Sequence, residues 1–188
     1  YQGEDATFLV NSYYQNLSAR CQRLPLGIID EKFIQPQGEQ PIRLQDIYTD
    51  LDTAAIPKET GEDVLRYGWR LSQAREGDRE PILEAVACED LPYMTLLGDA
   101  GSGKSTFINY LTYRLLADPN GLPEILQNRP IIRLVLRDVL PFISSTKSAG
   151  TATCLWDTLL ADIQKRIGET NASKVMLTLQ QKVMETPC

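Results

Sequence analysis

Three glycines, a lysine and two serines lie close together in residues 98–106, which read Gly-Asp-Ala-Gly-Ser-Gly-Lys-Ser-Thr. The glycines at 98, 101 and 103 let the backbone turn through dihedral angles that a Cβ atom would penalise. A backbone that turns this tightly points successive N–H groups to one side, where they form a nest for an anion. The residue types and their spacing therefore predict a loop that binds phosphate groups.

This loop matches the pattern Gly-x-x-x-x-Gly-Lys-Ser/Thr, known as Walker A. A helix is expected to begin at Lys104, so that its free N–H groups and its dipole also favour phosphate. The Lys104 ammonium group would reach the β- and γ-phosphates of ATP or ADP, while the Ser105 hydroxyl would bind Mg²⁺. Thr106 is expected to support the α-phosphate. The predicted nucleotide site comprises Gly98, Asp99, Ala100, Gly101, Ser102, Gly103, Lys104, Ser105 and Thr106, with Ser105 as the metal ligand.

Apolar runs on both sides of the loop predict the elements that hold it. Residues 93–98 suit a buried parallel strand, and residues 104–116 carry apolar side chains at helical spacing. Residues 131–136 are β-branched and alternating, which predicts a second strand. We therefore expect an α/β P-loop NTPase fold, with a parallel sheet flanked by helices and an N-terminal helical and extended segment. Only two such strands are evident, so an incomplete domain is expected.

The remaining chain divides into two predicted parts. Residues 1–80 are expected to form an N-terminal helical and extended segment with a linker, and residues 81–188 the N-terminal half of the P-loop domain. Pro81 marks one helix start, and residues 42–52 suggest a short strand or extended segment. The two connections, at 24–41 and 54–80, are rich in polar, proline or glycine residues. Further amphipathic helices are predicted at residues 6–21, 154–168 and 172–185.

The overall composition excludes several classes of function. The 188 residues carry a net charge of −6, which argues against direct binding of nucleic acid or of an anionic membrane. The chain has no histidine, which excludes Ser-His and Cys-His catalytic pairs within it. Its four cysteines lie far apart and suit buried or free thiols in a reducing cytoplasm. No stretch is long and apolar enough for a membrane span, and no signal peptide is visible.

The order of these motifs resembles the NACHT family, within the STAND class of signalling P-loop NTPases. Four stretches carry the resemblance, over about residues 41–139. The strand, loop and helix around the Walker A pattern is the first, and the strand that ends in Leu136-Arg137-Asp138 is the second. The segment at 42–52 and the short helix that begins near Pro81 complete the set.

The resemblance implies roles for residues outside the loop. Ile47, Tyr48 and Leu51 would flank the adenine, with plain core packing as the alternative. Arg137 would orient a phosphate or a neighbouring loop, against the simpler interpretation of a surface salt bridge. The family's Walker B acid and sensor residues would lie beyond Cys188. Family members switch between a closed ADP state and an open ATP state, so protein partners are implied through other domains or through oligomerisation.

Two other classes of function remain open from the sequence. One is a different P-loop class, such as an AAA+ motor or a small-molecule kinase; a GTPase is disfavoured because the chain has no NKxD-like motif. The other is an interaction scaffold that binds nucleotide without turnover. We assign no catalytic residue. Asp138 is the one acid at a predicted strand end, and a solvated or capping role is favoured there over metal binding.

Overall fold

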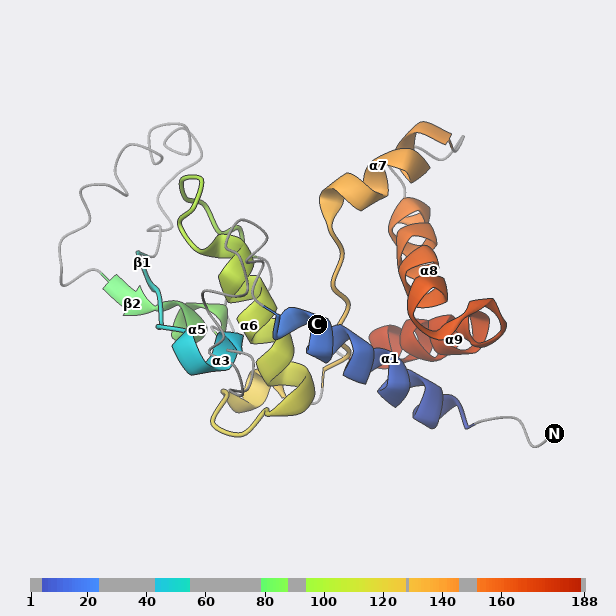
Figure 1. Cartoon of the computed structure of the whole chain (residues 1–188), viewed down its shortest axis with the longest axis horizontal. Helices are drawn as coiled ribbons and strands as arrows, with labels where there is room; N and C mark the ends of the chain where they lie inside the picture. The colour runs from blue at the N-terminus through green and yellow to red at the C-terminus, as the bar shows by residue number, and fades with distance from the viewer. Residues whose placement is uncertain are drawn as a thin grey trace, which may run out of the picture.

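The computed structural model describes residues 5–23, 43–54, 79–87, 94–127, 129–145 and 152–186, and these residues form mainly helices (Figure 1). The elements before the Walker A pattern are α1 (Ala6–Cys21), α3 (Leu44–Ile47), β1 (Asp52–Ala54), β2 (Arg79–Pro81) and α5 (Ile82–Val86). Those after it are α6 (Lys104–Ala117), a 3₁₀ turn η3 (Glu124–Leu126), α7 (Leu136–Ser145), α8 (Thr153–Ile167) and α9 (Glu169–Glu185).

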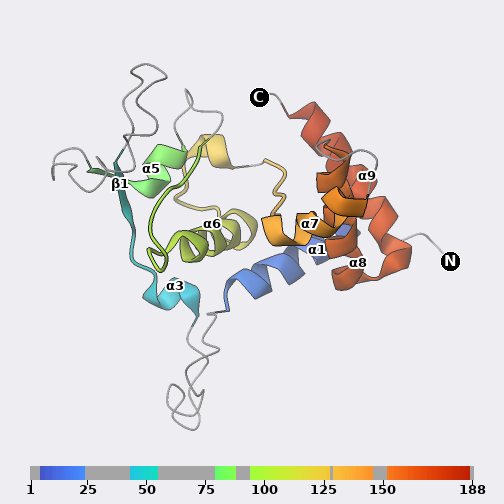
Figure 2. The ribbon, with the colours of Figure 1, turned by 90° about the horizontal axis from the view of Figure 1, so that it is seen from above.

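Helix α1 connects the two sides of the structure. It contacts α6 toward one end and α8 and α9 toward the other, as both views show (Figure 2). Its start is capped by Asp5, whose side chain accepts a hydrogen bond from the Thr7 N–H at 3.1 Å. Four-residue spacing places Leu9, Tyr13, Leu17 and Cys21 on one buried face. This stripe makes α1 the central helix of the core.

The core lies where α1, α8 and α9 meet. Gly168 separates α8 from α9 with a φ of +83°, a conformation that glycine adopts without a steric penalty. The chain can therefore reverse in one residue, and α8 packs against α9. The fully buried side chains at this junction include Tyr13, Leu17, Leu159, Ile163, Val175 and Leu179. Trp156 packs against this cluster.

The prediction of a parallel sheet is wrong. Within the described residues, the only strand pairing is a short antiparallel ladder between β1 and β2. Both strands have three residues and pair Asp52 with Pro81 and Ala54 with Arg79. The fold class is therefore corrected from an α/β parallel sheet to a helical assembly with one small β-ladder.

Within the described residues, neither of the two predicted sheet strands has a partner strand. Residues 94–99 have no regular secondary structure, and the side chains of Met94 and Leu97 are exposed. Residues 129–135 are also irregular, and α7 begins at Leu136, inside the predicted strand. Ile132 and Leu134 pack against the helical core instead. A strand satisfies its backbone groups only through a neighbouring strand, so apolar alternation cannot make one alone.

Other predicted elements are confirmed. The helices expected at residues 6–21, 104–116, 154–168 and 172–185 correspond to α1, α6, α8 and α9. The helix predicted to start at Pro81 is the short α5. The strand or extended segment predicted at 42–52 is only partly confirmed, because Leu44–Ile47 form a helical turn and strand β1 begins at Asp52, while residue 42 lies outside the described residues. The predicted loop at 24–41 and most of the connection at 54–80 lie outside the described residues.

Two of the four cysteines lie within the described residues. Cys21 and Cys154 are buried, as expected, and burial raises the pKa of the Cys21 thiol. Cys88 and Cys188 lie outside the described residues. None of the helices in the described ranges has both the length and the apolar content that crossing a membrane requires.

Candidate functional site

The Walker A loop leads directly into the first turn of α6. Gly103 is the N-cap residue, and its carbonyl oxygen accepts the first intrahelical hydrogen bond from the Phe107 N–H at 2.8 Å. The N–H groups of Lys104, Ser105 and Thr106 therefore have no intrahelical acceptor. They project from the positive end of a helix of 14 residues, where an anion is favoured.

The Lys104 ammonium group folds back onto the loop. It donates hydrogen bonds to the carbonyl oxygens of Gly98 and Asp99, both at 2.6 Å, and to Ser102 Oγ at 3.0 Å. Three acceptors match the three donors of an ammonium group. The loop thus holds a positive charge at its centre, beside the free N–H groups of α6. A phosphate that binds there would exchange these neutral acceptors for charged oxygens, which form stronger hydrogen bonds.

Two glycines of the loop adopt backbone angles that other residues avoid. Gly101 has a φ of +83° and Gly103 a φ of +84°. Gly98 has another constraint, because a Cβ atom there would lie 2.7 Å from Ser102 Oγ. A Cβ atom at Gly103 would lie 3.2 Å from Leu51 Cδ1. The backbone conformation expected from the sequence is thus present at Gly101 and Gly103.

The other predicted site residues differ in exposure. Asp99, Ala100, Ser102 and Ser105 are exposed to solvent, while Thr106 is half-buried. Among the described residues, no group of three or more acidic, cysteine or histidine side chains could hold a metal ion. Magnesium commonly binds through one or two protein oxygens together with phosphate oxygens and water. The Ser105 hydroxyl is therefore suited to Mg²⁺ that arrives with a nucleotide.

An apolar cavity of about 140 Å³ lies directly beside the loop. Gly103 and Thr106 form its loop side, and residues around α3 form the rest. Ile47, Tyr48 and Leu51, the residues predicted to flank the adenine, all line it. Leu44 and Thr49 also line it, and sequence reasoning missed them. The helical periodicity of the α3 turn could have indicated Leu44, which is buried there.

Tyr48 gives this cavity an aromatic wall. Its ring stacks on that of Tyr110 from α6, with centroids 3.7 Å apart and planes 11° from parallel. Burial raises the pKa of Tyr48 to about 12, with a further contribution from the Asp50 carboxylate. Its buried hydroxyl makes no hydrogen bond of good geometry within the described residues, although the Leu51 backbone lies near enough to lower that pKa slightly. The stack fixes the α3 segment against α6.

The predicted Arg137 and Asp138 lie elsewhere. Both are exposed residues in the first turn of α7, and Arg137 Nε is 3.6 Å from Asp138 Oδ1. They line a second cavity that the loop residues do not line. The structure therefore favours the salt-bridge interpretation of Arg137 and does not bring Asp138 together with the Walker A loop.

Replacing Gly103 by alanine is expected to weaken ADP binding by about tenfold or more. The left-handed conformation costs roughly 1 kcal/mol for alanine, and the new methyl group would press on Leu51 beside the cavity. Gly121→Ala is the matched control, because Gly121 has a φ of +77° and lies beyond the other end of α6. Both variants should lose similar stability in urea unfolding, but calorimetry should show weaker ADP binding for Gly103→Ala alone. Equal binding by the two variants would contradict this placement of the site.

Comparisons of this chain with protein families, with curated proteins and with solved structures found no match.

Proposed function

We propose that the chain binds ATP or ADP, together with Mg²⁺, through residues 98–106. The observation that carries this proposal is the position of the Lys104 ammonium group within the loop, next to the free N–H groups that begin α6. This arrangement combines a fixed cation, a backbone that can turn around an anion and the positive end of a helix. Each of the three favours phosphate, and all three come from the same nine residues.

The proposed position of the base is the apolar cavity beside Gly103 and Thr106. Its volume of about 140 Å³ is below the roughly 300–1,000 Å³ of sites that enclose a drug-sized ligand, so it would take one planar group. Tyr48 and Leu51 would contact that group, while the phosphates extend along the loop. The cavity and the loop share Gly103 and Thr106, which supports a single ligand that contacts both.

For the wider role, we propose a NACHT-type nucleotide-dependent switch that acts in signalling or immune defence in the cytoplasm. The Walker A loop and the Tyr48 segment are the features that support it. No carboxylate lines the cavity beside the loop in the described part of the chain, so we assign ATP hydrolysis to a longer protein. Protein partners would be recruited through other domains or through oligomerisation when the bound nucleotide changes.

Calorimetric titration with ADP and ATP in the presence of Mg²⁺ tests the proposal. We expect a Kd on the order of micromolar for both nucleotides and no release of phosphate over hours. GTP serves as a comparison for selectivity of the base. Absence of binding by ADP and by ATP would refute the proposed site in this chain. Steady phosphate release would agree with nucleotide binding at this site, but it would refute the proposal that ATP hydrolysis requires a longer protein.

Replacing Ser105 by alanine is expected to lower the affinity for Mg²⁺-ATP by about tenfold, because one metal ligand is lost. Binding of ADP in EDTA should stay within about twofold, since no metal is then present to lose that ligand. Ser12→Ala is a suitable control, because Ser12 lies on α1, is not part of the loop and does not line the cavity beside it. If the affinity falls equally with and without Mg²⁺, Ser105 is not the metal ligand.

A further inference from the structure

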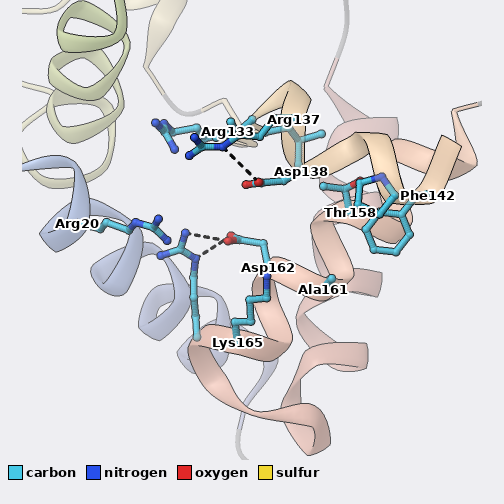
Figure 3. Close-up of a pocket in the computed structure, with 13 residues that line it drawn as sticks. Arg20, Arg133, Arg137, Asp138, Phe142, Thr158, Ala161, Asp162 and Lys165 are labelled. Atoms are coloured by element: carbon cyan, nitrogen blue, oxygen red, sulfur yellow. Dashed lines mark hydrogen bonds and ion pairs between the residues drawn. The ribbon is translucent and has the colours of Figure 1, made fainter. Parts of the chain in front are cut away.

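A second and larger cavity lies between α1, α7 and α8, with a volume of about 430 Å³ (Figure 3). This volume falls within the roughly 300–1,000 Å³ of small-molecule sites. Its lining includes five cationic side chains, namely Arg20, Arg133, Arg137, Lys165 and Arg166. Two carboxylates, Asp138 and Asp162, leave an excess of three positive charges. That excess is unusual in a chain with a net charge of −6, and it indicates an anionic ligand.

Both carboxylates already have cationic partners within the cavity. Asp162 accepts two hydrogen bonds from Arg166, at 2.7 and 2.9 Å, and a third from the Tyr13 hydroxyl at 3.2 Å. Asp138 pairs with Arg137, whose Nε atom is 3.6 Å from Asp138 Oδ1. Among the described residues, no ion pair joins Arg20, Arg133 or Lys165 to a carboxylate. The charge excess therefore resides on these three side chains.

Arg133 gives the most direct sign of a ligand. One terminal nitrogen donates to Asn109 Oδ1 at 2.8 Å, but its Nε atom is buried and has no hydrogen-bond partner within the described residues. A buried N–H group without an acceptor is costly. Guanidinium groups bind phosphate and carboxylate oxygens through two parallel N–H donors. Because the Nε atom has almost no accessible surface, an anion in the cavity would bind the terminal nitrogens of Arg133 and would reach Nε only if the guanidinium group turned toward it.

The opposite end of the cavity is less charged. Figure 3 shows the labelled arginines and both carboxylates on one side of the cavity and Phe142 and Thr158 on the other side. Phe142 offers an aromatic surface there, and Pro141 adds to it. A bare inorganic ion would leave this end in contact with water alone. The shape therefore suits a ligand with an anionic group at one end and an apolar body at the other.

We propose that this cavity binds a small phosphate monoester with an aromatic or apolar body. A phosphate monoester carries close to two negative charges at neutral pH, which complements the three unpaired cations better than one carboxylate does. Its oxygens would accept from Arg133, Arg20 and Lys165, while its body would contact Phe142. The site does not depend on the Walker A loop, whose residues line a different cavity.

Calorimetric titration with phenyl phosphate tests this proposal, with the Lys104→Ala chain as the parent so that the loop does not contribute. Arg20→Gln is expected to weaken binding by about tenfold, the loss of one charge-assisted contact. Arg23→Gln is the matched control, because Arg23 follows the same helix end, is exposed and does not line the cavity. Inorganic phosphate and benzoate should each bind several-fold more weakly than phenyl phosphate, because inorganic phosphate has no apolar body and benzoate carries one negative charge instead of close to two.

Three results would overturn the proposal. The first is absence of phenyl phosphate binding at millimolar concentration, and the second is an equal loss in Arg20→Gln and Arg23→Gln. The third is unchanged binding in Arg20→Gln and in Lys165→Gln, two exposed positions whose substitution should leave the helical circular dichroism spectrum intact. Arg133→Gln adds a test of the half-buried guanidinium group, and if that variant does not fold, the binding measured for the variants at the two exposed positions decides.

Discussion

Replacing Lys104 by alanine is expected to weaken binding of both ADP and ATP by about 100-fold. The Lys104 ammonium group donates to the carbonyl oxygens of Gly98 and Asp99 and to Ser102 Oγ, so it lies at the centre of the loop that would surround the phosphates. A hydrogen bond to a charged group contributes roughly 1.5–3 kcal/mol, and 100-fold corresponds to about 2.7 kcal/mol. Calorimetric titration of the purified variant with each nucleotide measures the change.

The same substitution should leave the fold almost unchanged. The acceptors that Lys104 occupies are exposed, so water replaces the ammonium group when it is removed. We expect the free energy of unfolding to change by less than about 0.5 kcal/mol, as for most surface substitutions. A large loss of nucleotide affinity with little loss of stability would mean that Lys104 binds phosphate. A large loss of stability would mean that Lys104 mainly holds the loop in its conformation.

Lys174→Ala is the control for charge. Lys174 is an exposed lysine on α9, so its loss changes the net charge of the chain by the same amount. If both variants bind nucleotide equally well, Lys104 has no special role and the phosphate-binding interpretation is wrong. If Lys104→Ala unfolds at markedly lower urea concentration than Lys174→Ala, the lysine serves the structure of the loop instead.

Local patterns in the sequence predicted the helices and the conformation of the loop well. Helix α1 follows from the helical spacing of its apolar residues, namely Phe8, Leu9, Tyr13, Leu17 and Cys21, because this spacing is local to one helix. Of these five residues, Phe8 is exposed and the other four are buried. The positive φ angles of Gly101 and Gly103 follow equally locally, because a tight turn at a helix start requires them. These features need no knowledge of the rest of the fold.

The sheet could not be predicted in the same way. An apolar run such as residues 131–136 becomes a strand only when another strand pairs with it, and pairing is a property of the whole fold. In this structure the Ile131 N–H donates to the Tyr14 hydroxyl on α1 at 3.2 Å, and Leu134 packs on the helical core. Contact with α1, which lies more than a hundred residues earlier in the chain, replaced the expected strand partner.

The two cavities also differ in how far the sequence could predict them. The Walker A loop was evident from consecutive residues, and the α3 residues beside it entered only through a family resemblance. The cationic cavity joins Arg20 of α1 with Arg133 and with Lys165 of α8, and nothing in the sequence places these residues together. Only the Asp162–Arg166 pair, four residues apart on one helix, could have been identified from spacing.

The largest stability change is expected for Leu17→Ala, at about 3 kcal/mol. Leu17 is fully buried on the face of α1 that meets the core, with Tyr13 one turn before it and Cys21 one turn after it. Truncation of a buried leucine to alanine removes its apolar contacts and leaves a cavity that its neighbours fill only in part, which costs roughly 2–5 kcal/mol. Urea unfolding followed by circular dichroism at 222 nm, the usual helical signal, measures the loss.

Leu177→Ala is the matched control, since Leu177 is on α9 and its side chain is 66% exposed. The chemical change is identical, and both positions are helical, so helix propensity cancels between the two variants. We expect Leu177→Ala to change the free energy of unfolding by less than about 0.5 kcal/mol. A small effect at Leu17, or an equal effect at both positions, would contradict a core in which α1 packs against α6, α8 and α9. A large loss of stability in Leu17→Ala alone would support the packing of the buried face of α1 against the rest of the core.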